Sequence, residues 1–171
     1  MRNPIIFAAA ASLALLTGCT DAATSKREAG NWVNEVDLIK FEVPGMPPEM
    51  KESMTQMMAS AGNNNFCLTA EEAAKSDLES LLDSSGGNAG ECTWTKKEVK
   101  GANVDVVGSC AQNGQKADLA MTGTLESKRS DITITTKAKL PDGNEMEMVM
   151  RVKSKHTGAC QAGSENSAAV G

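Results

Sequence analysis

Seven methionines fall into two groups whose spacing could build a metal site. The first group has the i, i+4, i+7, i+8 spacing of one helix face: Met50, Met54, Met57 and Met58. The second group alternates along a strand-like segment: Met146, Met148 and Met150. Thioethers are soft ligands that select Cu(I), so a helix lying on that strand would predict a copper site between the groups. Methionine also fills apolar cores and forms soft surfaces for apolar partners, and we favour the core interpretation.

Four cysteines in the body of the chain predict two disulfide bonds: Cys67, Cys92, Cys110 and Cys160. Zinc is the competing interpretation, but no C-x-x-C pair occurs among them, so disulfides are favoured. Four cysteines allow three pairings. A hairpin turn centred on Gly101 would set Cys92 opposite Cys110 and would leave Cys67 for Cys160.

Residues that could support catalysis are few. His156 is the only histidine, and a lone polar histidine is more often a surface residue than a general base. No G-x-S-x-G motif occurs, and disulfide-bonded cysteines cannot act as nucleophiles. The acidic turn at residues 142–145 lacks the ligand spacing of a calcium loop. We therefore predict no enzymatic activity and no cofactor, and a hydrolase with an unidentified site is the last of three functional alternatives.

The N-terminal residues predict export and lipid attachment. After the charged Arg2, residues 5–16 carry no charge; this run is shorter than the about 20 residues that span a bilayer, but it suits a signal peptide. The residues that follow resemble the lipobox of bacterial lipoproteins: Leu16, Thr17, Gly18 and Cys19. The resemblance implies that signal peptidase recognises residues 16–18, cuts before Cys19 and leaves lipid on its thiol.

The lipid makes a membrane the first expected partner. In lipoproteins of the enterobacterial kind, aspartate directly after the cysteine retains the protein in the inner membrane, whereas Thr20 stands here. The resemblance therefore implies a cell-envelope protein anchored in the outer membrane and facing the periplasm. Cleavage changes the net charge from −5 to −6, because Arg2 leaves with the leader. No basic run is longer than Lys96–Lys97, so nucleic acid is excluded as a partner. The sequence identifies no protein or small-molecule ligand.

Periodicity indicates how the chain is organised. We expect a signal peptide over residues 1–18, a flexible lipidated tether over 19–30, one disulfide-stabilised β-rich domain over 31–160 and a disordered tail over 161–171. Residues 32–43 predict a strand whose alternation slips midway, as at a bulge. The first methionine group predicts a helix opened by Pro47 and Pro48, and Thr69-x-x-Glu72 predicts the capping box of a second helix.

From residue 91 onward the pattern changes to period two. Alternating segments lie at residues 92–99, 103–110, 116–125, 131–140 and 145–153. Each of the last three has one apolar face and one charged or threonine-rich face, which is typical of an antiparallel meander covered on one side. The predicted fold is α+β: an antiparallel, curved meander of about six strands, with two helices inserted after the first strand to cover its apolar face.

The order of several short motifs resembles a known family. The motifs are Gly30-x-Trp32, the Met46–Met50 segment, Cys67-Leu68-Thr69 and Gly158-x-Cys160. In this order they are similar to the bacterial envelope family of domain of unknown function 3617, over roughly Gly30 to Cys160. Asn31 and Ala70 depart from the family's usual residues without touching the cysteines. The resemblance implies export, a cysteine framework and a β-rich domain, but no activity.

These observations favour an exported, membrane-anchored envelope lipoprotein with a binding or structural role. Cu(I) handling through the methionine faces is the alternative from another functional class.

Overall fold

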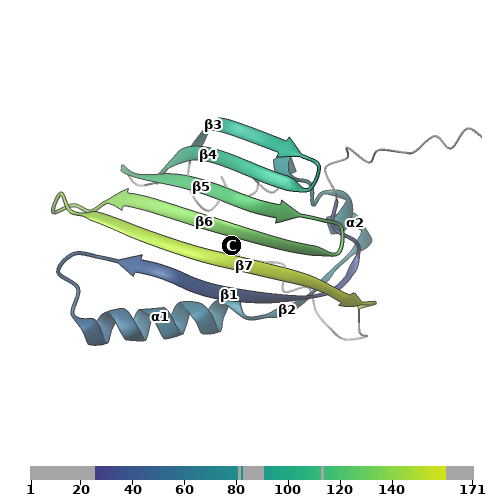
Figure 1. The fold of residues 1–171 in the computed structure, drawn as a ribbon, viewed down its shortest axis with the longest axis horizontal. Helices are drawn as coiled ribbons and strands as arrows, with labels where there is room; N and C mark the ends of the chain where they lie inside the picture. The colour runs from purple at the N-terminus through teal and green to yellow at the C-terminus, as the bar shows by residue number, and fades with distance from the viewer. Residues whose placement is uncertain (1–25, 81, 83–90, 113, 161–171) are drawn as a thin grey trace, which may run out of the picture.

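A computed structural model describes residues 26–80, 82, 91–112 and 114–160. Within these ranges the protein is mainly β, with one antiparallel seven-stranded sheet and a few short helices (Figure 1). The strands are β1 (Gly30–Glu42), β2 (Asn65–Leu68), β3 (Glu91–Lys100), β4 (Asn103–Gln112), β5 (Gln115–Leu125), β6 (Arg129–Lys139) and β7 (Glu145–Gly158). The helices are α1 (Pro48–Gly62) and α2 (Ala70–Ala74).

The sheet is an open meander with the strand order β2-β1-β7-β6-β5-β4-β3. Every neighbouring pair is antiparallel, and β3 to β7 are connected in sequence by short turns. The turns use the residues that the sequence suggested. Gly101 adopts φ +62° between β3 and β4, and the Asp142 carboxylate accepts a hydrogen bond from the Asn144 N–H (3.0 Å) between β6 and β7.

β1 carries the bulge that its slipped alternation predicted. The register with β7 shifts between Leu38 and Lys40, and the extra residue, Ile39, is 60% exposed. Before the bulge Leu38 pairs with Met150, and after it Phe41 pairs with Met148. The shift returns Phe41 to the apolar face of the sheet, where it is buried.

The strand count of six was wrong, because β2 was not predicted. This strand has only four residues and begins in the run Asn63–Asn65, which reads as a helix stop. It pairs with the first residues of β1, from Gly30 to Val33. The two helices are therefore not consecutive insertions after the first strand, since β2 separates them.

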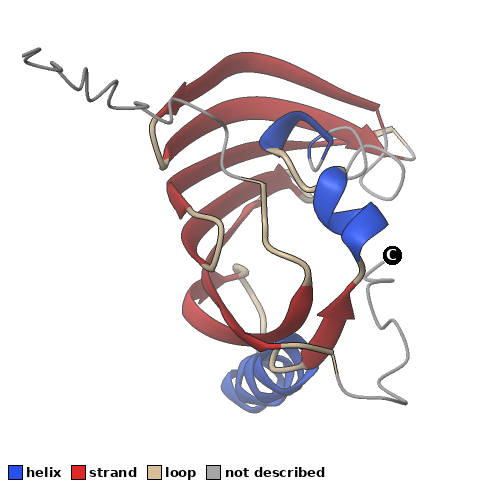
Figure 2. Ribbon diagram, turned by 90° about the vertical axis from the view of Figure 1, so that its right-hand side faces the viewer, coloured by secondary structure: helices blue, strands red, loops and turns tan. Residues whose placement is uncertain are grey.

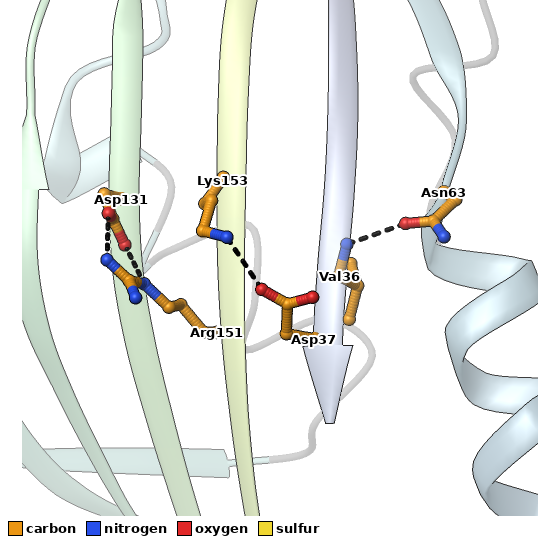
Figure 3. A network of polar contacts seen from close by, with 6 residues as sticks. All are labelled: Val36, Asp37, Asn63, Asp131, Arg151 and Lys153. Carbon is orange, nitrogen blue, oxygen red and sulfur yellow. Dashed lines mark hydrogen bonds and ion pairs between the residues drawn. The ribbon is translucent and has the colours of Figure 1, made fainter. Parts of the chain in front are cut away.

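The expectation that both helices cover the apolar face was also wrong for α1. This helix lies along the edge of β1, beyond the end of β2 (Figure 1). Its C-terminal turn is attached there, because Asn63 Oδ1 accepts a hydrogen bond from the Val36 N–H (2.8 Å; Figure 3). The helix thus protects an edge that the short β2 leaves unpaired.

The sheet is strongly curved, and α2 lies on the inner side of the curve (Figure 2). One buried cluster joins this helix to the β1–β2 pair: Trp32, Phe66, Leu68 and Ala73. A second cluster joins Leu82 to β4 and β5 through Val104, Val106 and Leu125. Both clusters lie toward the same end of the sheet, where β1 begins and β5 ends.

Two disulfides form, as the cysteine number predicted. Cys92 and Cys110 face each other across β3 and β4, with a Cα–Cα distance of 4.0 Å. Cys67 of β2 is bonded to Cys160, which follows β7, with a Cα–Cα distance of 5.4 Å. The pairing is the one that a hairpin centred on Gly101 favours.

Candidate functional site

The inner side of the curved sheet is apolar over its central strands. Register places on this side of β1, β7, β6 and β5 twelve apolar side chains that are partly exposed, and we call these twelve the concave apolar face. It consists of Val36 and Leu38 of β1, Met146, Met148, Met150 and Val152 of β7, Ile132, Ile134 and Ala138 of β6, and Ala117, Leu119 and Met121 of β5. This face is continuous across four strands because side chains of directly paired residues point to the same side of a sheet.

The concave apolar face is only half-buried. All twelve of its residues keep part of their surface exposed, although Met121 and Ile132 also border the second core cluster. The buried apolar side chains on this side are Trp32 and Val106 at one end, and Phe41, which pairs with Met148 of β7, nearer the other end. An antiparallel sheet normally buries its apolar face against another layer, so this face is short of cover along much of its length.

The covered end is built by α2 and the residues after it. Thr69 caps α2: its hydroxyl accepts from the Glu72 N–H, and the Glu72 carboxylate accepts from the Thr69 N–H. The predicted capping box is therefore confirmed, and the helix ends at Ala74. Asp77 then accepts a hydrogen bond from the Ser80 N–H (2.8 Å), and Leu78 and Leu82 pack against the β4–β5 cluster.

A second segment, residues 26–29, forms hydrogen bonds at the covered end both with the residues after α2 and with the β5–β6 turn. The Arg27 N–H donates to Ser76 Oγ (2.9 Å) after α2, and the Glu28 N–H donates to the Ser127 carbonyl (2.7 Å) at the β5–β6 turn. The Trp32 indole N–H donates to the Glu28 carbonyl (2.9 Å). These residues belong to the segment that the sequence predicts as a tether, and here they are attached to the domain.

Arg27 is the most unusual polar residue at this end. Its guanidinium carbon lies 4.1 Å from the Trp32 ring centroid and 5.1 Å from that of Phe66. Its Nε and Nη2 atoms are buried and have no hydrogen-bond partner. Burial lowers the pKa of Arg27 to about 10, so the side chain remains a cation at neutral pH. Sequence reasoning missed this residue, because it stands in a short polar stretch with no motif around it.

The outer side of the sheet is covered by ion pairs instead. Lys153 of β7 donates to Asp37 of β1 (2.8 Å), and Arg151 makes two hydrogen bonds to Asp131 of β6 (2.6 and 2.7 Å; Figure 3). These contacts lower the pKa of Asp131, mainly through the Arg151 hydrogen bonds. Cross-strand pairs of this kind stabilise the register and keep the outer face solvated, so the two faces differ sharply in character.

A hollow of about 500 Å³ opens at the uncovered end of the sheet, next to the start of α1. Two methionines line it, Met46 and Met146, together with Lys51 and Lys137. Three carboxylates, those of Glu42, Glu145 and Glu147, border it as well. One of these is held in place, since the Glu147 carboxylate accepts a hydrogen bond from Lys40 (2.7 Å) and its pKa is lowered mainly by that bond.

The two predicted methionine groups occupy different parts of the fold. Met146, Met148 and Met150 lie on the concave apolar face. The α1 group is carried by a helix that runs along β1, with β1 between it and β7 (Figure 1). In that helix Met50 and Met57 are largely exposed, at 55% and 62%. The structure therefore does not lay the helix over β7, as a shared copper site would require.

The remaining predicted residues fall in two places. His156 packs edge-on against Trp32 (ring centroids 5.6 Å apart), and its Nε2 lies 3.2 Å from the Ala29 carbonyl oxygen. Leu16, Thr17, Gly18 and Cys19 lie outside the described residues.

Among the described residues no three His, Cys, Asp or Glu side chains gather in a way that could hold a metal ion. No helix in the described ranges is long and apolar enough to cross a bilayer.

Comparisons with known proteins agree with the motif order found in the sequence. Neither the curated proteins nor the solved structures contain a match to this chain. A family model does match, over residues 27–160, which covers every strand and helix described above. The chain therefore belongs to the family described as protein of unknown function (DUF3617).

Proposed function

We propose that this protein is an exported lipoprotein whose domain binds an apolar ligand on the concave apolar face. The observation that carries the proposal is the half-burial of that face over β5, β6 and β7. A folded domain gains about 25 cal/mol for each Å² of apolar surface that leaves water. A contiguous apolar surface that stays partly exposed is therefore typical of a binding site.

The composition of the face supports a ligand without a fixed shape. Methionine is unbranched and flexible, so Met146, Met148 and Met150 can repack around different apolar groups. The inner sides of β5 and β6 supply branched aliphatic side chains and small alanines, with no charged residue among the twelve. Such a surface favours an elongated apolar chain over a polar solute.

The membrane anchor is the second part of the proposal. The pattern at residues 16–19 supports lipid attachment at Cys19 and a place in the cell envelope, facing the periplasm. We propose the outer membrane as the site of anchoring, because Thr20 rather than aspartate follows the lipidated cysteine. An anchored domain would then meet apolar ligands at or near the lipid surface.

Binding of the neutral dye Nile red to the mature chain, with Cys19 replaced by serine, tests the apolar site. We expect dye fluorescence to rise on binding, and Ile134→Gln to weaken the affinity by about tenfold, because it removes one apolar contact worth about 1.5–3 kcal/mol. Thr135→Gln is the matched control, since Thr135 is the next residue of β6 and its side chain faces the other side of the sheet. Equal loss of affinity in both variants would contradict a site on the concave side.

Cu(I) handling is the second candidate, and the hollow beside α1 favours it specifically. Met46 and Met146 line that hollow together with carboxylates, and thioethers select Cu(I). Native mass spectra of the mature chain with Cu(I) and a competing chelator test this function. Retained copper that disappears in Met146→Leu would support it, while Met54→Leu should leave it intact. A chain that never retains copper would exclude it.

A further inference from the structure

Arg27 places a positive charge at the covered end of the concave apolar face. Trp32, on which its guanidinium stacks, points to the same side of β1 as Asn34 and Val36. On the adjoining strand β7 the matching residues are His156, Ser154 and Val152. One continuous inner surface therefore runs from the buried cation, across the Asn34–Ser154 hydrogen bond (2.6 Å), to the apolar residues.

The acidic residues of the surrounding elements are engaged elsewhere. The Glu28 carboxylate pairs with Lys128 (3.3 Å), and Glu72 accepts from the Thr69 N–H and hydroxyl, both at 2.8 Å. Asp77 accepts from the Ser80 N–H and lies 4.0 Å from Lys26. None of them bonds to Arg27, whose Nε and Nη2 have no hydrogen-bond partner. A partly buried cation with two shielded nitrogens and no counter-charge is costly, so its retention calls for an explanation.

The stacking geometry leaves Nε and Nη2 without a protein partner but shielded from solvent, so an anion would reach them by displacing the residues that cover them. The Trp32 and Phe66 rings contact its face, whereas its N–H groups point outward in the guanidinium plane. Two of these N–H groups can bind one carboxylate or phosphate in a bidentate fashion. The apolar surroundings would strengthen that interaction, because the local dielectric is low.

We propose that the ligand is an anionic amphiphile, with its acidic head against Arg27 and its apolar chain along the concave apolar face. This inference rests on the proposed function, because it assigns a chemical class to the ligand of the same surface. The head occupies the covered end, and the chain runs from Val36 and Val152 toward Met146. A fatty acid is the simplest molecule with this arrangement.

A purely structural role for Arg27 makes a different prediction. In that case the guanidinium only holds residues 26–29 onto Trp32 and Phe66 by cation–π stacking. An apolar side chain of similar length would then fill the same space without the cost of burying charge. Such a change would leave the binding of acidic and neutral amphiphiles equally unaffected.

Isothermal titration of the mature chain with dodecanoate and with dodecanol separates these alternatives. We expect Arg27→Met to weaken dodecanoate binding by about tenfold or more, because a charge-assisted hydrogen-bond pair is lost. Dodecanol binding should remain within about twofold. Arg129→Met removes an exposed arginine that is paired with Glu126, and it should leave both affinities unchanged. Circular dichroism checks that each variant is folded.

The outcomes distinguish failure of the inference from failure of the function. Equal binding of dodecanoate by wild type and Arg27→Met would overturn the head-group site, while dodecanol binding would still support the apolar site. Failure of both ligands to bind the wild-type chain would overturn the proposed function itself. If Arg27→Met does not fold, Arg27→Lys decides the matter. It retains the charge but loses the bidentate fork, so selective weakening of dodecanoate supports the site and unchanged binding overturns it.

Discussion

At the scale of single residues, two glycines with positive φ differ in what surrounds them. Gly123 of β5 has φ +148°, and a Cβ there would meet the carbonyl oxygen of Asp131 on β6. Gly101 has φ +62° at the β3–β4 turn and has open space around it. We expect Gly123→Ala to lower the free energy of unfolding by roughly 3 kcal/mol, against about 1 kcal/mol for Gly101→Ala. Urea denaturation measures both, and equal losses would mean that the close approach of β5 and β6 is unimportant.

A second residue-scale prediction concerns the outer ion pairs. The Arg151 hydrogen bonds hold the pKa of Asp131 below its ordinary value. A lowered carboxyl pKa contributes stability above the unfolded-state value of about 3.9, and that contribution is lost as the pH falls through the folded-state pKa. Wild type should therefore lose more Tm than Asp131→Asn between about pH 7 and about pH 3. The difference should be small and should shrink in high salt, because the pair is exposed. Equal Tm losses in wild type and Asp131→Asn would contradict a stabilising role for the Asp131–Arg151 ion pair.

Among single residues, the sequence predicted the role of the cysteines but not that of Arg27. The number of cysteines predicted two disulfides and left three pairings open, and the register of one glycine turn favoured the pairing that is found. The position of Arg27 could not be predicted. Its role depends on residues 26–29 meeting Ser76, Ser127 and Trp32, and no local pattern encodes those long-range contacts.

At the scale of elements, signals that depend on neighbouring residues were predictable. The bulge in β1, the Thr69 cap and both tight turns are local, and all of them are present. β2 and the position of α1 depend instead on which edge of β1 is left open. A four-residue strand has too few alternations to be recognised. The helix has methionines on one face, but the sequence does not say whether that face meets the side of the sheet or its edge.

The cap of α2 supports the covered end of the sheet and can be tested at this scale. Thr69→Ala removes the hydroxyl that accepts from the Glu72 N–H, so we expect a loss of about 1 kcal/mol in unfolding free energy. Thr55→Ala is the control, because the Thr55 hydroxyl bonds only to the Lys51 carbonyl within α1. Alanine is the better helix former there, so stability should stay equal or rise slightly. Thermal denaturation compares the two, and a similar loss in both would argue against the cap.

At the scale of the whole molecule, the two disulfides constrain the sheet, and the proposed lipid would constrain where the domain is located. Cys92–Cys110 ties the β3 edge of the sheet, and Cys67–Cys160 ties β2 to the residue that follows β7. Both bonds constrain an open sheet that has little cover on its inner side, and both suit an oxidising compartment. The proposed lipid anchor would add a constraint of another kind, because it would keep the domain near a membrane.

The proposed anchor gives a prediction for the full-length chain. Cys19→Ser removes the only thiol at the proposed cleavage site, so the expressed protein should no longer incorporate radiolabelled palmitate and should leave the membrane fraction. The domain itself should still form two disulfides, which a mass four hydrogens below that of the reduced chain would reveal. Thr17→Ala is the control, because alanine is also small and should still be processed. Membrane retention of Cys19→Ser without label would show that something other than lipid on this cysteine holds the protein there.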